Sequence, residues 1–130
     1  MRYALSTTVV RDFAETLQAT RDALAEQGFG VLTEIDVAAT LKQKIDVDVP
    51  AQVILGACRP PLAHAALQAE PSIGLLLPCN VVVRDVGDGA TLVEAIDPEI
   101  MEKLTENEQL AEVSADARKR LQAALDSLSA

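Results

Sequence analysis

Residues 52–61 read QVILGACRPP, and this stretch is the best guide to the fold. Its first seven residues, Gln52–Cys58, are almost continuously apolar, which is typical of a central strand buried on both faces. Pro60 and Pro61 follow at once, and proline is favoured in the first turn of a helix because its missing N–H costs no hydrogen bond there. The stretch therefore predicts a buried strand that passes directly into a helix over residues 62–69.

Two further strand–helix units are expected before this strand. Residues 2–10 predict a first strand, and residues 29–35, which alternate in polarity, predict a second. Asp12 is suited to cap the helix between them, and Asp36 is suited to begin another helix that Pro50 stops. Residues at helical spacing mark the inward faces of the two helices: Phe13, Leu17, Thr20 and Leu24 in the first, and Val37, Leu41 and Ile45 in the second.

A hairpin is expected after the helix at 62–69. Residues 71–78 form a short connection with a proline at each end, and residues 80–85 and 90–96 predict two strands. The residues between these strands, VGDG at 86–89, are a strong signal for a tight turn.

The last part of the chain is expected to be helical. Asp97–Pro98 is suited to open a helix, and a long amphipathic segment with a break near Ser114 follows. The order of elements is then βαβαβαββα, in a single domain over residues 1–130. Since strands joined by a hairpin run antiparallel, the sheet is not all parallel. We expect an α+β fold with a five-stranded mixed or antiparallel sheet and helices packed mainly on one face.

Composition limits the classes of function. The chain has 130 residues, only 2% of them aromatic, and a formal net charge of −9. Nucleic-acid binding relies on Lys and Arg to neutralise phosphates, so we expect no nucleic-acid partner. Apolar runs of about five residues fall far short of the roughly 20 that span a bilayer, so we expect no membrane partner. Residues 1–8 lack the apolar core of a signal peptide, which predicts a cytoplasmic protein with Cys58 and Cys79 as reduced thiols.

Cys58, His64 and Cys79 form the one constellation that suggests chemistry. Cys58 ends the buried strand just before a helix, where partial positive charge and the neighbouring Arg59 favour a thiolate, so we expect it to be the more nucleophilic thiol. Cys79 follows Pro78 and begins the next strand. The two thiols approach one end of the sheet if the strands that begin near 52 and 80 are neighbours.

Three interpretations of this constellation stay open. In the first, both cysteines are small buried apolar residues, and His64 is a surface or capping residue. In the second, one or both thiols are reactive or form a reversible disulfide. In the third, Cys58, His64 and Cys79 bind a soft metal or haem. The spacing of the two cysteines is not that of a zinc knuckle, so we predict no metal and no cofactor.

Three motifs in this chain resemble those of the family called domain of unknown function 302. They are VILGACRPPLAHAAL at 53–67, IGLLLPCNVVV at 73–83 and DPEIM at 97–101. The resemblance implies a small α+β domain that stands alone in bacteria and archaea and forms a homodimer, with no established activity. The family pattern maps onto six residues of this chain: Gly56, Cys58, Pro60, Pro61, Pro78 and Cys79.

The function that we expect is a cytoplasmic, homodimeric module that binds or senses a small ligand. Its thiol-containing site includes Cys58 and Cys79, with five neighbouring candidates: Arg59, Pro60, Pro61, His64 and Pro78. One alternative is an enzyme of thiol or sulfur redox chemistry. Another is a structural interaction protein, with the helix at 62–69 or the C-terminal helix as its dimer surface. The residues do not decide whether the protein is an enzyme.

Overall fold

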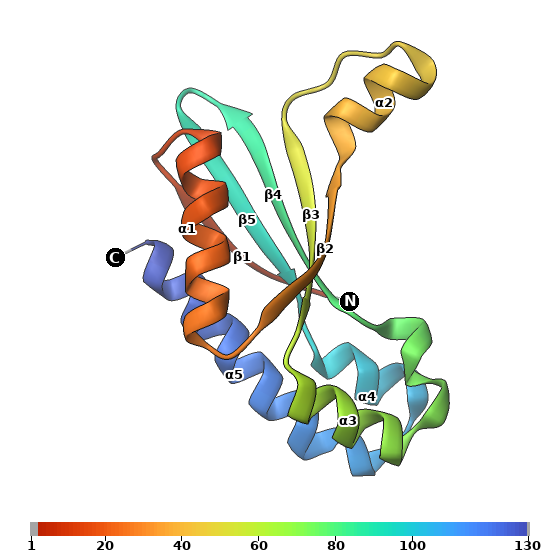
Figure 1. Cartoon of the computed structure of the whole chain (residues 1–130). Helices are drawn as coiled ribbons and strands as arrows, with labels where there is room; N and C mark the ends of the chain where they lie inside the picture. The colour runs from red at the N-terminus through yellow and green to blue at the C-terminus, as the bar shows by residue number, and fades with distance from the viewer. Residues whose placement is uncertain (1–2, 130) are drawn as a thin grey trace.

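The computed structural model describes residues 3–129 (Figure 1). Strands and helices follow the predicted order, with two short 3₁₀ helices, η1 and η2, added. The elements are β1 (Ala4–Val9), α1 (Phe13–Glu26), β2 (Gly30–Asp36), α2 (Val37–Ile45), β3 (Gln52–Cys58), α3 (Pro60–Ala69), η1 (Pro71–Leu76), β4 (Cys79–Gly87), β5 (Ala90–Ile96), α4 (Glu99–Thr105), η2 (Glu108–Leu110) and α5 (Ala111–Leu128).

Side-chain caps begin α1 and α2 where the sequence predicts. The Asp12 carboxylate accepts a hydrogen bond from the Glu15 N–H at 2.8 Å, and Asp36 accepts one from the Ala39 N–H at 2.9 Å. Such bonds satisfy amide groups that the first turn of a helix leaves unpaired. The end of α2 differs from the prediction: the helix stops at Ile45, before Pro50, because Asp46 turns left-handed with φ 54°.

The five strands form one sheet in the order β1-β5-β4-β3-β2, and every neighbouring pair is antiparallel. The β4–β5 hairpin turns through Gly87, Asp88 and Gly89, all with positive φ, which explains the glycines at this turn. The register of β3 and β4 sets Ala57 opposite Cys79. The mixed sheet is thereby excluded and the antiparallel one confirmed.

Helices α1 and α5 cover one face of the sheet and enclose the main core (Figure 1). Leu55, Val81 and Val93 point to this side and are fully buried. Residues of the opposite face alternate with them along the strands and are partly exposed, so β3 is not buried on both faces as its sequence suggests. We call this second side the open face; its middle row, read across the sheet, is Ser6, Glu94, Val82, Ile54 and Ile35.

The two ends of the sheet are different. Helices α3 and α4 and η1 gather at one end around a second small core of Ala66, Ile73, Met101 and Leu110. Helix α2 projects at the other end (Figure 1). Helix α5 runs without the expected break, since Ser114 lies buried within it. No helix within residues 3–129 is long and apolar enough to cross a membrane.

Candidate functional site

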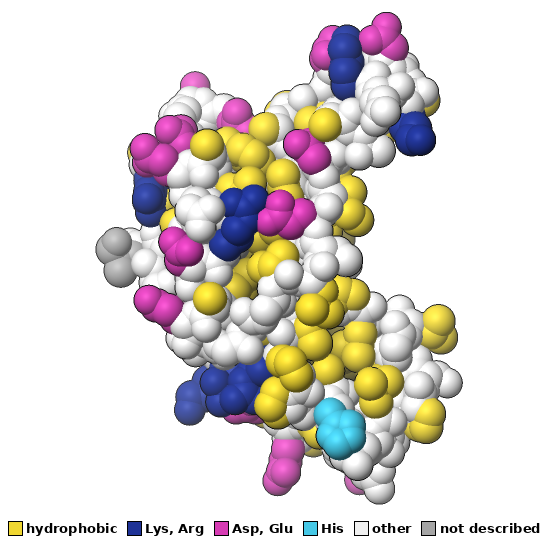
Figure 2. Space-filling model, viewed as in Figure 1, with side chains coloured by type: hydrophobic (Ala, Val, Ile, Leu, Met, Phe, Trp, Pro, Cys, Tyr) yellow, Lys and Arg dark blue, Asp and Glu magenta, His cyan; other side chains and the backbone are white. Residues whose placement is uncertain are grey.

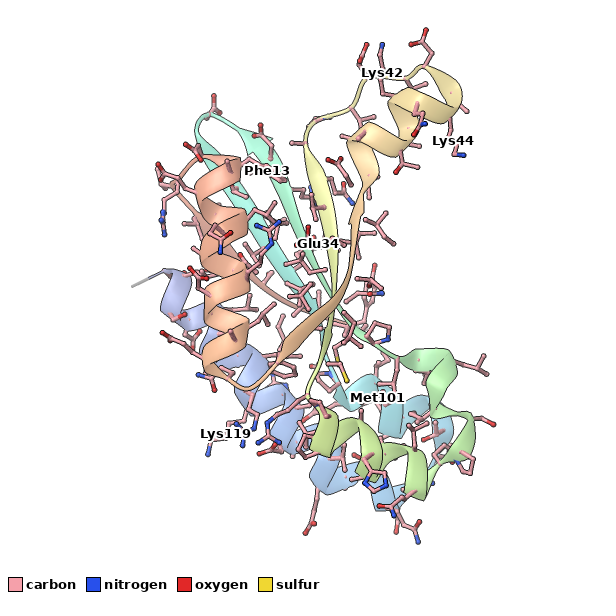
Figure 3. The ribbon with its side chains drawn as sticks, viewed as in Figure 1. Phe13, Glu34, Lys42, Lys44, Met101 and Lys119 are labelled. Carbon is pink, nitrogen blue, oxygen red and sulfur yellow. The ribbon has the colours of Figure 1, made fainter. Side chains whose placement is uncertain are left out.

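The two cysteines lie at the same end of the sheet. Because Ala57 pairs with Cys79, Cys58 at the end of β3 lies close to the start of β4. Both residues line a cavity of about 30 Å³, together with Phe29 and Met101. Figure 3 shows Met101 reaching from α4 toward this end of the sheet. A cavity this small holds one or two water molecules and no organic substrate.

Cys79 is a poor candidate nucleophile. It is only 8% exposed, and burial raises the pKa of its thiol to about 11, with the nearby Cys58 adding to the rise. Burial has this effect because a thiolate is poorly solvated among apolar groups. At neutral pH the Cys79 thiol is therefore protonated and behaves as a small apolar side chain.

The start of α3 lacks the donors that would favour a thiolate at Cys58. Pro60 and Pro61 have no N–H, and the next two amides, of Leu62 and Ala63, both donate to the Arg59 carbonyl at 3.0 Å. The positive end of a helix resides mainly in its unpaired N–H groups. These four residues therefore provide no free amide, and the part of the support predicted for Cys58 that came from unpaired N–H groups is missing at this helix start.

The Arg59 side chain lies across the turn after α1. A Cβ atom placed on Gly28 would come within 3.0 Å of Arg59 Nε and 3.5 Å of Cδ. Within residues 3–129 this buried Nε has no hydrogen-bond partner. Gly28 also has φ 84°, so a glycine here both ends α1 and leaves room for the arginine.

His64 does not join the thiols. It is exposed on α3 and lines neither cavity that includes Cys79. Among the side chains of residues 3–129, no three His, Cys, Asp or Glu residues gather in a way that could hold a metal ion. The structure therefore does not bring Cys58, His64 and Cys79 together as the ligands of one soft-metal or haem site.

A larger cavity of about 420 Å³ lies between η1, α4 and the end of the sheet. Pro78 and Cys79 form part of its wall, and the Leu77–Pro78 peptide bond is cis. None of its lining residues is charged, and only Tyr3 and Asn80 bring a polar amide or hydroxyl group: Tyr3, Leu75, Leu76, Leu77, Pro78, Cys79, Asn80, Ile96, Pro98, Ile100, Met101 and Leu104. The cavity therefore favours a small, uncharged and mainly apolar molecule.

Gly56 positions Pro78 at this cavity. A Cβ atom on Gly56 would collide with Thr33 Oγ1 and would lie 2.9 Å from Pro78 Cγ. The absence of a side chain on β3 thus lets the proline ring lie close against the strand. Gly56 therefore contributes to the site because it has no side chain.

Sequence reasoning found only one wall of the larger cavity. Pro78 and Cys79 were predicted site residues, whereas Tyr3 and the α4 residues Ile100, Met101 and Leu104 were not. Tyr3 reaches this place because its carbonyl accepts a hydrogen bond from the Asp97 N–H at 2.8 Å. A usable signal was present in the apolar residues after Pro98, which sit in an otherwise acidic segment.

Comparisons with known proteins agree with this architecture. The chain is similar to a solved structure described as the crystal structure of an uncharacterized conserved protein DUF302 from Bacillus stearothermophilus. The two share 30% sequence identity with a TM-score of 0.89, over 97% of this chain and 98% of the other. A search among curated proteins found no match. The family model described as domain of unknown function DUF302 matches residues 5–128, and the chain belongs to that family.

Proposed function

We propose that this protein is a cytoplasmic, homodimeric prokaryotic module that binds or senses a small, uncharged and mainly apolar molecule. The larger cavity carries the proposal, because its volume of about 420 Å³ falls within the usual range of ligand pockets, roughly 300–1,000 Å³. Its wall holds no charged side chain although the chain has a net charge of −9. This separation of charge from the cavity supports an uncharged ligand.

The two thiols are wall residues in this proposal, Cys58 of the small cavity alone and Cys79 of both. Cys79 lines both cavities, and its neutral thiol offers an apolar surface to a ligand in the larger one. A redox enzyme needs an accessible thiolate as nucleophile. The raised pKa of Cys79 and the lack of free N–H groups at residues 60–63, the helix start after Cys58, both favour ligand binding over that alternative.

The test uses N-phenyl-1-naphthylamine, a neutral apolar fluorophore, titrated into the full chain. Saturable fluorescence with one site per chain is expected. Leu104→Glu sets a carboxylate at the mouth of the cavity, and since Leu104 is 59% exposed the change leaves the core intact. We expect its affinity for the fluorophore to fall at least about tenfold, because an uncompensated charge near an apolar ligand is costly.

The matched control is Val10→Glu, which adds the same charge at an exposed apolar residue away from the cavity. Its affinity for the fluorophore should equal that of the wild type. A wild-type chain without saturable binding contradicts the proposal. So does a Leu104→Glu variant that binds as tightly as the control.

A further inference from the structure

We infer that the open face of the sheet and the α2 helix together form a two-fold interface between two copies of this chain. The inference rests on the homodimeric part of the proposed function and names the surface through which the two copies meet. An interface of this kind joins the same patch on both copies, so the patch must be complementary to itself.

The open face has the apolar centre that such a contact needs. Its middle row places Val82, Ile54 and Ile35 side by side on the three strands β4, β3 and β2. Ile35 is 49% exposed, Ile54 and Val82 are partly exposed, and no helix within residues 3–129 covers this row (Figure 1). Contiguous exposed apolar surface of this kind marks an interaction site in a soluble protein.

The second observation is the α2 arm, which we define as residues 37–50. Helix α2 has nine residues, none of them buried, and the arm leaves Ile45, Val47 and Val49 exposed. A helix this short is marginal in water unless an apolar face packs against something. The arm projects on the side of the sheet away from α1 and α5 (Figure 1). A partner on the open face is therefore placed to cover it.

The outline of the molecule suits such a partner. Figure 2 shows the surface hollowed between the α2 arm and the end that carries α3 and η1, with hydrophobic side chains gathered along the hollow. Five strands about 4.8 Å apart and six residues of about 3.3 Å each give a flat area of about 480 Å². With the arm added, this approaches the roughly 800 Å² of surface that each partner contributes to a standard interface.

Charge identifies the occupant as a second copy. On the open face, the middle row is flanked by one row that runs through Arg84 and another that runs through Asn80. The charged residues of these three rows are Arg84 and Glu94, whose side chains pair with each other at 3.3 Å. The arm carries Lys42 and Lys44 against Asp46 and Asp48, so its formal charge is also zero. The whole excess of nine negative charges lies elsewhere on the chain. Two strongly acidic molecules can thus meet through these neutral surfaces without like charges facing each other.

The test is sedimentation equilibrium of the full chain over a series of concentrations, with three apolar-to-lysine variants. Val82→Lys changes the centre of the open face, and Ile45→Lys changes the arm, where Ile45 is 63% exposed. Leu67→Lys changes an exposed leucine on α3, the helix that sequence alone suggested as dimer surface. Val82 lies opposite Glu94 on the neighbouring strand, so a lysine at position 82 faces a carboxylate of opposite charge. The substitution is therefore compatible with the folded monomer.

The wild type and Leu67→Lys should sediment at twice the mass of the chain. Val82→Lys and Ile45→Lys should weaken the dimer about 100-fold or more, because each buries an unpaired charge in the contact. Each lysine also lowers the net negative charge, so added repulsion between copies does not explain a loss of dimer. Circular dichroism on each variant verifies that the fold is kept, and Ile45→Lys leaves the core untouched in any case.

A wild-type monomer overturns the inference. A dimer that survives both Val82→Lys and Ile45→Lys, or one that only Leu67→Lys dissociates, also overturns it. The fluorophore titration is read independently on the same samples. A monomer that still binds the fluorophore refutes the dimer alone, whereas a dimer that binds no fluorophore refutes the ligand proposal alone.

Discussion

Replacing Gly56 with alanine tests how closely the site depends on space left by a missing side chain. The new Cβ would collide with Thr33 Oγ1 and approach Pro78 Cγ to 2.9 Å. Thr33 is exposed, so its hydroxyl can rotate away at little cost. The proline ring has no such freedom, and either it or β3 must move.

The expected cost follows from two opposing effects. Extra atoms forced into close packing destabilise a protein by about 1–3 kcal/mol. Gly→Ala also stiffens the unfolded chain, which stabilises the folded state by about 0.4–1 kcal/mol. Gly56→Ala should therefore lower the free energy of unfolding by about 1–2 kcal/mol. For a chain of this size that lowers Tm by roughly 3–10 °C.

The assay is urea unfolding followed by far-ultraviolet circular dichroism, since the chain has no tryptophan for fluorescence. Gly74→Ala is the matched control, because a Cβ there meets nothing within 4 Å and Gly74 has no positive φ. It should be neutral or slightly stabilising. Gly56→Ala should also change the affinity for the fluorophore, because Pro78 lines the larger cavity.

A second substitution separates the two contacts. Thr33→Ala removes the hydroxyl, so the double variant Gly56→Ala/Thr33→Ala should recover part of the lost stability while the contact with Pro78 persists. If Gly56→Ala is as stable as Gly74→Ala, the reasoning is refuted. If Thr33→Ala restores the wild-type value in full, the role assigned to Pro78 is refuted.

Two further predictions follow from the titrating groups. Iodoacetamide should alkylate Cys79 in the folded protein at a rate that keeps rising with pH toward about 11, measured by mass spectrometry of the peptide; a rate that levels off near pH 9 contradicts a buried thiol. Arg21 hydrogen-bonds Glu34 and lowers its pKa, so the pair's stabilisation is present above the ordinary glutamate value of 4.5 and is lost as pH falls through the lowered value. Since both side chains are about a third or more exposed, Arg21→Ala should cost under about 1 kcal/mol at pH 7 and less in acid, and equal costs at both pH values contradict it.

The parts of the fold that the sequence predicts well have causes within a few residues. Asp12 and Asp36 cap helices through amides three residues away, and Gly87 and Gly89 make a turn that joins adjacent strands. The extent of burial was predicted less well. The apolar run of β3 suggests cover on both faces, but whether a second layer covers Ile54 depends on a contact outside this chain's own helices.

The larger cavity could not be predicted from the sequence, because its walls come from distant parts of the chain. Tyr3 and Asp97 meet through one backbone hydrogen bond, and only the pairing of β1 with β5 brings them together. Tyr3 and Asp97 are too far apart in the sequence for a spacing pattern to predict this contact. Local patterns thus indicate the elements, while the site depends on their long-range register.

The helix start beside Cys58 shows how one feature supports a structural prediction and weakens a chemical one. Pro60 and Pro61 made α3 predictable because the first turn needs no N–H from them. The same absence removes two of the donors that would have stabilised a thiolate or an anion there, and the Arg59 carbonyl engages the next two. A proline pair is therefore a signal for a helix and a signal against anion chemistry at its N-terminus. The lack of free donors here supports the proposed binding of an uncharged, mainly apolar molecule over thiol chemistry at Cys58.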